Sequence, residues 1–226
     1  MKKTLLFCNG LSGSGKTYFI KNTLPAGLFY NLRSATTRPM RDGESEGNPY
    51  FFRDESYFDN APLATLLWVN RHVWTPGDKK WMYGIPEQEV YDHLGQNLIY
   101  DVIEPRYARQ LKDWFKRHGL DSQYNFRVAY FLPPINHMNT VNSRANMPND
   151  ATVRTLNTCN PGDFTRENLR IDYIMRPIDG IYDPRLMAHI DQLVRSRFQI
   201  NPPVNPGDFL ILPVFQPSLL CGESHC

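Results

Sequence analysis

The octapeptide from Gly10 to Thr17, GLSGSGKT, has the glycine, lysine and hydroxyl spacing of a phosphate-binding loop, GxxxxGK followed by Ser or Thr. Its glycines let the backbone curl so that successive N–H groups point at a phosphate. Lys16 is expected to bridge two phosphates of a nucleotide as an exposed loop charge, and Thr17 to place its hydroxyl on Mg²⁺. The loop residues that we expect to bind ATP are Gly10, Ser12, Gly13, Ser14, Gly15, Lys16 and Thr17. The motif thus predicts a nucleotide site that uses ATP and Mg²⁺.

A second cluster of chemically active residues contains two arginines and a tyrosine. Arg38 and Arg41 flank a predicted turn, and Tyr50 returns on the next predicted strand. Two planar guanidinium groups and a phenol hydroxyl that converge from neighbouring strands would clamp a phosphate or a carboxylate. Taken alone, the same residues also fit a charged hairpin that faces solvent.

The rest of the chain predicts a rigid scaffold for these side chains. Short apolar runs indicate buried strands, and longer segments between them indicate helices. We expect strands at 4–9, 67–74, 97–103, 127–132 and 172–175, and helices at 16–22, 55–66, 87–94, 105–118 and 184–198. Their alternation predicts an α/β fold with a parallel central sheet covered by helices on both faces. Residues 29–52 are rich in Arg, Thr, Tyr and Phe, which indicates an inserted subdomain of short antiparallel strands.

From the phosphate-binding loop through SATTRPMRDGESEGNPYFF (34–52) to the Tyr83-Gly84 pair, the sequence resembles guanylate kinase. The resemblance implies a P-loop nucleoside monophosphate kinase, which moves the γ-phosphoryl group of ATP to a nucleoside monophosphate, with GMP or dGMP as the usual acceptor of the family. It also implies a set of acceptor-binding residues: Ser34 at the base, Arg38, Arg41, Tyr50 and Tyr83 at the phosphate, and Asp101 near the metal and the acceptor. Mg²⁺ would be held by Thr17 with water molecules, and Asp101 is a second candidate ligand.

Charge determines the mechanism that we expect. Two phosphate groups repel each other, so cations must line the path between them. By the resemblance, Lys16 and Arg41 provide this charge together with Arg144 and Arg154, which are similar to the lid arginines of the family. A covalent intermediate is not needed, because the attacking phosphate oxygen is already ionised.

The resemblance fails where guanylate kinases recognise guanine. They carry Ser or Thr after the Tyr-Gly pair, whereas this chain has Ile85. They carry Glu about nine residues before that tyrosine, whereas Trp74 stands here, or Asn70 if the segment contains an insertion. A site that lacks these hydrogen-bonding groups should prefer a different base, so we expect phosphate binding to be retained and base choice to be altered.

We expect one guanylate kinase-like domain at 1–198, followed by an appended tail at 199–226. Within the domain, the core takes 1–31 and 87–135, the acceptor-binding subdomain 32–86, the lid about 136–165, and the final strand and helix 166–198.

Bulk properties exclude several other classes of protein. A net charge of +2 over 226 residues does not fit a general binder of nucleic acids. The cysteines at 8, 159, 221 and 226 have the spacing of neither a zinc site nor a disulfide framework. The apolar run near the N-terminus is too short for a signal peptide, and a membrane-spanning stretch is not expected. We therefore expect a cytoplasmic monomer or homodimer that binds small nucleotides, not nucleic acid or membranes; for a virus-encoded protein, which the compact divergent chain suggests, the location is the host cytoplasm.

Three functions remain open from the sequence. The first is a nucleoside monophosphate kinase with altered base choice. The second is a kinase of another small phosphorylated metabolite such as a ribose phosphate, which would explain the absent guanine contacts. The third is a non-catalytic guanylate kinase-like binding module, which the intact phosphate-binding loop disfavours.

Overall fold

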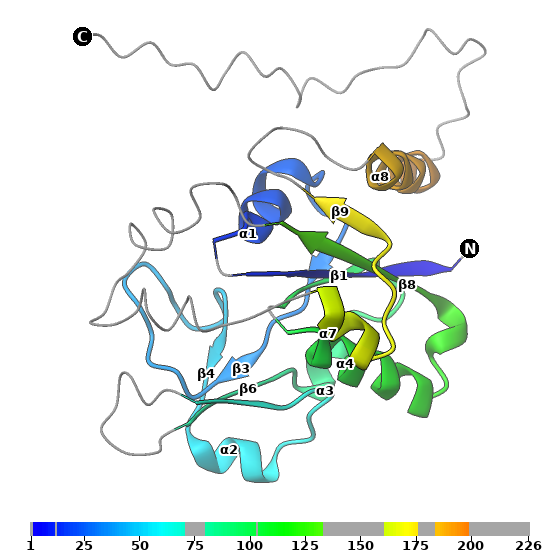
Figure 1. Cartoon of the computed structure of the whole chain (residues 1–226). Coiled ribbons are helices and arrows are strands. Elements are labelled where there is room, and N and C mark those ends of the chain that lie inside the picture. Colours follow the sequence, from blue (N-terminus) through cyan, green and yellow to red (C-terminus); the bar gives the residue numbers. More distant parts are fainter. Residues whose placement is uncertain are drawn as a thin grey trace, which may run out of the picture.

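The computed structural model describes residues 2–11, 13–70, 80–102, 104–132, 161–175 and 184–198. Its centre is a five-stranded sheet with the strand order β2-β7-β1-β8-β9 (Figure 1). The strands are β1 (Lys3–Gly10), β2 (Tyr30–Asn31), β7 (Leu98–Val102), β8 (Tyr124–Phe131) and β9 (Tyr173–Met175). Every neighbouring pair is parallel, which confirms the predicted α/β class. In β1 only Lys3 is exposed, as expected for a central strand with both faces covered.

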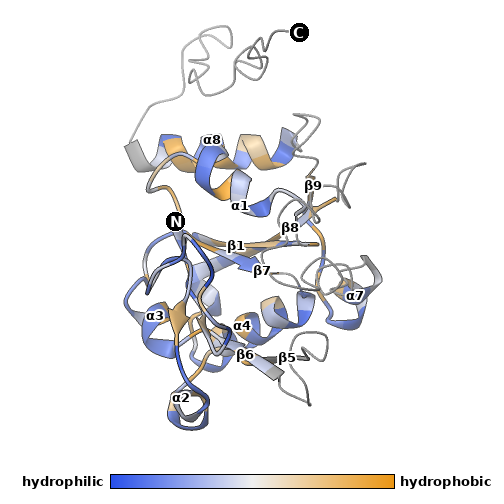
Figure 2. Cartoon of the chain, turned by 90° about the vertical axis from the view of Figure 1, so that its left-hand side faces the viewer, coloured by the Kyte–Doolittle hydropathy of each residue, from blue (hydrophilic) through white to orange (hydrophobic). Residues whose placement is uncertain are grey.

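Helices cover both faces of this sheet (Figure 2). One face packs on α1 (Lys16–Tyr18), on the π-helical turn Phe19–Thr23 that continues it, and on α8 (Pro184–Phe198). The other face packs on α3 (Glu87–Tyr91), α4 (Pro105–Arg117) and α7 (Pro161–Arg166). A short 3₁₀ turn, Asp121–Gln123, leads into β8. Alternate residues of β1 enter the two cores, so Leu5 and Phe7 face α4 while Leu6 and Cys8 face α8.

A second sheet lies beside the first and has the order β4-β3-β6-β5. Its strands are β3 (Ala35–Thr36), β4 (Phe51–Phe52), β5 (Leu67–Asn70) and β6 (Lys80–Gly84). The prediction of a purely antiparallel subdomain is wrong in one place, because β3 and β4 run parallel while β6 is antiparallel to both β3 and β5. The segment 37–50 is long enough to return the chain to the same end of the sheet, so these two strands are not a hairpin.

Helix α2 (Glu55–Asn60) follows β4 and is shorter than the predicted 55–66. Its first turn is capped, because the Asp54 side chain accepts a hydrogen bond from the Tyr57 N–H at 3.0 Å. It ends at Asn60 because the residue before a proline avoids helical backbone angles, and Pro62 follows Ala61.

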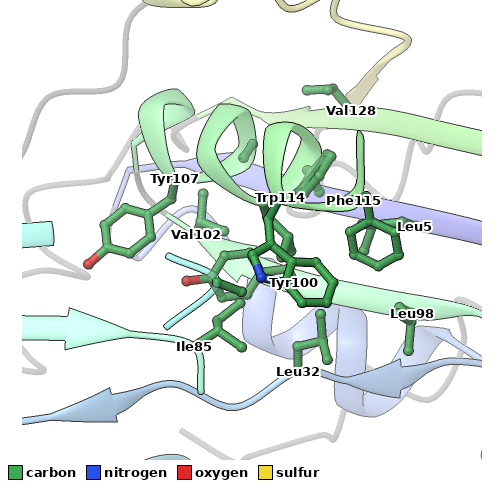
Figure 3. Close-up of a cluster of buried hydrophobic side chains, with 14 of the residues drawn as sticks. Leu5, Leu32, Ile85, Leu98, Tyr100, Val102, Tyr107, Trp114, Phe115 and Val128 are labelled. Atoms are coloured by element: carbon green, nitrogen blue, oxygen red, sulfur yellow. The ribbon is translucent and has the colours of Figure 1, made fainter. Parts of the chain in front are cut away.

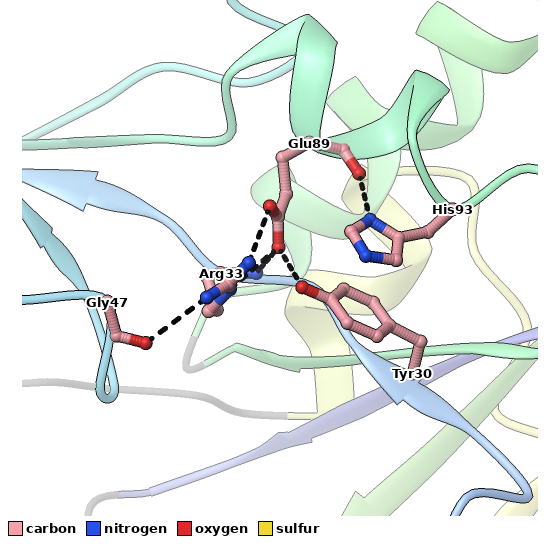
Figure 4. A network of polar contacts seen from close by, with 5 residues as sticks. All are labelled: Tyr30, Arg33, Gly47, Glu89 and His93. Carbon is pink, nitrogen blue, oxygen red and sulfur yellow. Dashed lines mark hydrogen bonds and ion pairs between the residues drawn. The ribbon is translucent and has the colours of Figure 1, made fainter.

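A polar network lies where the chain leaves the central sheet after β2 and returns to it through α3 (Figure 4). The buried carboxylate of Glu89 accepts hydrogen bonds from the Arg33 side chain at 3.0 and 3.2 Å and from the Tyr30 hydroxyl at 2.9 Å. Arg33 also donates to the Gly47 carbonyl at 3.4 Å, and His93 stacks on the Tyr30 ring. A buried carboxylate held by several donors makes this junction between β2, α3 and the loop at Gly47 rigid.

Of the predicted lid, only 161–165 falls in the described part of the chain, where it belongs to α7; the predicted tail lies outside it. Within the described residues, none of the helices has the length and hydrophobicity that crossing a bilayer requires.

Candidate active site

The phosphate-binding loop leaves the carboxyl end of β1, and its glycines adopt backbone angles that other residues avoid. Gly10 has a φ of 148°, Gly13 of 82° and Gly15 of 94°. A Cβ on Gly10 would lie 2.6 Å from the Phe131 carbonyl oxygen of the neighbouring strand. Glycine is therefore required at position 10 both by conformation and by the close approach of β8.

Lys16 is buried, contrary to our expectation of an exposed loop charge. Its Nζ donates to the carbonyl oxygens of Gly10 at 2.8 Å and Leu11 at 2.9 Å. It lies 3.9 Å from the Asp101 carboxylate. The loop thus curls around the ammonium group, which faces the space that the loop encloses.

Asp101 reaches the loop from β7, the strand next to β1. The register places Cys8 opposite Asp101, and the Thr17 hydroxyl donates to the Asp101 carboxylate at 3.2 Å. Burial raises the pKa of the Asp101 carboxyl, and the nearby Lys16 and Thr17 offset part of this rise. A nearby cation stabilises the ionised form of a carboxyl group whose pKa is raised by burial.

Thr17 and Asp101 offer a hydroxyl and a carboxylate oxygen, the hard donors that Mg²⁺ prefers. In the described part of the chain, groups of three or more His, Cys, Asp or Glu side chains suited to a metal are absent. Mg²⁺ commonly keeps several water molecules and is bound through one or two protein oxygens together with nucleotide phosphates.

The predicted phosphate clamp is only partly available for a ligand. Arg38 is buried, and its Nη2 donates to both carboxylate oxygens of Glu44 at 2.8 Å. Glu44 also accepts from the Arg41 backbone N–H at 2.8 Å. The Arg38 guanidinium lies over the Tyr50 ring, 5.3 Å from its centroid. Glu44 thus holds the turn that contains Arg38 and Arg41, which we call the arginine turn. Sequence reasoning missed this role, although the position of Glu44 three residues after Arg41 could have indicated it.

Tyrosines connect the second sheet with β7 and α4. The rings of Tyr50 and Tyr83 meet edge to face at 5.8 Å, and the Tyr107 hydroxyl donates to the Tyr83 carbonyl at 3.0 Å. The Tyr100 hydroxyl lies 3.2 Å from Ser34 Oγ. Burial raises the pKa of Tyr50 above its usual range and that of Tyr100 to about 12, so both phenols stay neutral near pH 7 and can donate hydrogen bonds to an anion.

Tyr100 and Tyr107 were not among the predicted site residues. The signal for Tyr100 was strand alternation, because side chains that follow one another in a strand point to opposite faces. Asp101 therefore points to the loop, while Tyr100 and Val102 point to the core that α4 covers (Figure 3).

Ile85 lies inside that same core and is fully buried (Figure 3). Its backbone N–H donates to Thr65 Oγ1 at 3.0 Å. An acceptor base could touch the Ile85 side chain only after the residues around it moved apart.

Several predicted site residues fall outside what the structure describes. Ser12, Trp74, Arg144 and Arg154 are outside the described residues. Asn70 ends β5, where it pairs with Lys80, but its side chain is not described. The lid arginines therefore remain predictions.

Comparison with known proteins agrees with the resemblance of the phosphate-binding segments. The chain is 36% identical over 118 residues to the guanylate kinase of Carboxydothermus hydrogenoformans. This match covers 49% of this chain and 53% of the relative. It is 33% identical over 131 residues to the guanylate kinase of Rhodopseudomonas palustris, covering 54% of this chain and 51% of the relative. Over the matched segments, the chain is similar to guanylate kinases.

The similarity to guanylate kinases covers only part of each protein. The chain spans about half the length of the curated relatives that it matches. None of the protein-family models matches it. The crystal structure of guanylate kinase from Anaplasma phagocytophilum aligns with a TM-score of 0.46 at 18% identity, over 88% of this chain and 97% of that one.

Proposed function

We propose that the protein is an ATP-dependent nucleoside monophosphate kinase. The observation that carries the proposal is the group formed by Lys16, Thr17 and Asp101, which combines a curled phosphate-binding loop with the oxygen donors of a Mg²⁺ site. Tyr50 and Arg38 lie on the second sheet and its arginine turn, where an acceptor phosphate would bind. Such an arrangement has one position for each of two phosphorylated substrates.

Phosphoryl transfer at this site depends on charge compensation. Lys16 would exchange the carbonyl oxygens of Gly10 and Leu11 for the phosphates of ATP, which are stronger acceptors. Thr17 and Asp101 would hold Mg²⁺, which would neutralise charge on the phosphate oxygens. Arg41, together with Arg144 and Arg154 of the proposed lid, would stabilise the charge that spreads over the transferred group.

We propose that the base choice of this kinase departs from that of the family, for which GMP or dGMP is the usual acceptor. Asp101 is turned towards Thr17, so it is committed to the loop and not to an acceptor base. Among the described residues, Ser34 and Tyr100 offer neutral hydroxyls on the acceptor side. Guanine presents N–H donors that a carboxylate would accept, and hydroxyls replace it weakly.

The test measures ATP consumption by the full chain with Mg²⁺ against ribo- and deoxynucleoside monophosphates, modified bases included, and against ribose phosphates. Turnover of at least one nucleoside monophosphate, with GMP below the best acceptor, is expected. Turnover of a ribose phosphate alone would replace the proposal by the sugar phosphate kinase. Absence of turnover with every compound would leave the non-catalytic binding module.

A further inference from the structure

We propose that Asn9 is a binding residue of this site, whose side-chain amide donates a hydrogen bond to a phosphate oxygen of the nucleotide held by the loop; the inference rests on the proposed function. Asn9 is 0% exposed. Among the described residues, neither its Oδ1 nor its Nδ2 has a hydrogen-bond partner. Buried amides are nearly always paired, because an unpaired one has lost its bonds to water without replacement.

The position of Asn9 is next to the proposed chemistry. It directly precedes Gly10, whose carbonyl holds the Lys16 ammonium group. In the sheet it pairs with Val102 of β7 and with Tyr130 of β8. By strand alternation its side chain shares a face with Phe7, on the side of the sheet where the acceptor tyrosines lie.

Another asparagine at the opposite edge of the same sheet shows that the fold can pair such a side chain. Asn97 Oδ1 accepts from the Thr4 N–H at 3.0 Å, and its Nδ2 donates to the Leu28 carbonyl at 3.4 Å. The amide beside the loop lacks such partners, and so does the buried hydroxyl of Ser14 within the loop. Two buried polar side chains, one directly before the loop and one within it, thus lack a partner among the described residues.

Because Asn9 is fully buried, a phosphate can reach its amide only when the loop shifts. Leu11 follows Gly10 and packs against the core on the Asn9 side, and its carbonyl is held by Lys16. When Lys16 turns to a phosphate, the carbonyls of Gly10 and Leu11 are released and the loop is free to shift. A neutral Nδ2 donor then adds a bond to the phosphate without disturbing the charges of Lys16 and Asp101.

The experiment compares the full-length wild type with Asn9→Leu, Asn9→Asp and the matched control Asn97→Leu. Each protein is melted with and without MgATP, and steady-state kinetics are measured with the best monophosphate. Without ligand, Asn9→Leu should melt at or above the wild-type temperature, because an apolar side chain of similar shape removes an unpaired amide. Its kcat/KM should fall about ten- to a hundredfold, the effect of one hydrogen bond to a charged group.

The variants separate binding from folding. Asn9→Asp keeps the shape but places a carboxylate beside phosphate, so it should lose more activity than Asn9→Leu. Asn97→Leu should lower the melting temperature and leave kcat/KM as in the wild type. Wild-type kinetics in both Asn9 variants would overturn the inference, as would a ligand-free Asn9→Leu protein destabilised as much as Asn97→Leu. If the wild type has no monophosphate substrate, the proposed function fails separately. The role of Asn9 is then tested by the rise in melting temperature that MgATP causes. An equal rise in the wild type and in Asn9→Leu would refute that role.

Discussion

Replacing Asp101 by Asn should make the protein more stable and much less active. The carboxylate lies 3.9 Å from the Lys16 ammonium group, which corresponds to an attraction of about 4 kcal/mol at an effective dielectric constant of about 20. Burial nevertheless raises the pKa of Asp101, so the loss of hydration outweighs this attraction and the bond from Thr17. The charged form is therefore a net cost to the folded state, and an uncharged amide of the same shape removes it.

The sign of the pH dependence follows from the direction of this shift. Between the unfolded pKa of about 3.9 and the raised folded pKa, the folded protein binds more protons at Asp101 than the unfolded chain does. The contribution of Asp101 to the free energy of unfolding therefore falls as the pH rises through this window. The advantage of Asp101→Asn should be full above the folded pKa and absent below the unfolded one. Each kcal/mol is worth about 2–4 °C in melting temperature for a domain of this size.

Activity should change in the opposite direction. Lys16 keeps its two carbonyl acceptors in the variant, so the loop should stay in place. The loss of a carboxylate at the proposed Mg²⁺ site should remove about 3 kcal/mol of transition-state stabilisation, on the order of a hundredfold in kcat. The test combines thermal melts at pH 7 and pH 3.5 with kinetics over a range of Mg²⁺ concentrations. Asp113→Asn on the surface of α4 is the control. Wild-type turnover, or a lower melting temperature at pH 7, would refute this account of Asp101.

Four further outcomes test the acceptor side and the loop. Arg38→Ala should raise the KM for the acceptor and lower the free energy of unfolding by about 3 kcal/mol, because it leaves Glu44 without its cation; calorimetry would contradict this with an unchanged melting temperature. Arg41→Ala should lower kcat as well as raise KM, and a change in KM alone would make Arg41 a simple anchor. Ile85→Thr should destabilise the core by about 1–3 kcal/mol by burying a hydroxyl, and recovery of GMP turnover in kinetic assays would show that the base does reach position 85. Lys16→Ala should abolish transfer with its circular dichroism unchanged, and wild-type turnover would sink the loop assignment.

The phosphate-binding loop was predictable because its requirements are local. The glycines at 10, 13 and 15 have positive φ values that other residues rarely adopt, and this requirement can be recognised from the motif. The close approach of β8 to Gly10 is an additional, tertiary requirement. Four strands of the central sheet were predictable for a similar reason, since a buried strand is a short apolar run wherever it lies in the sheet. The edge strand β2, Tyr30–Asn31, has no such run and was not predicted. Helix α8 was predicted with the bounds that the structure has, and α2 was predicted too long because Pro62 had been accepted inside it.

What the sequence alone determined is therefore the loop, the class of fold and the order of its elements, each of which depends on residues close together in the chain. The tertiary structure decided which groups meet. Thr17 and Asp101 are 84 positions apart and are joined by the register of β1 with β7, which local patterns do not specify. The burial of Lys16, the pairing of Arg38 with Glu44 and the unpaired amide of Asn9 likewise depend on which strands and turns become neighbours, because burial and hydrogen bonding are properties of the packed whole.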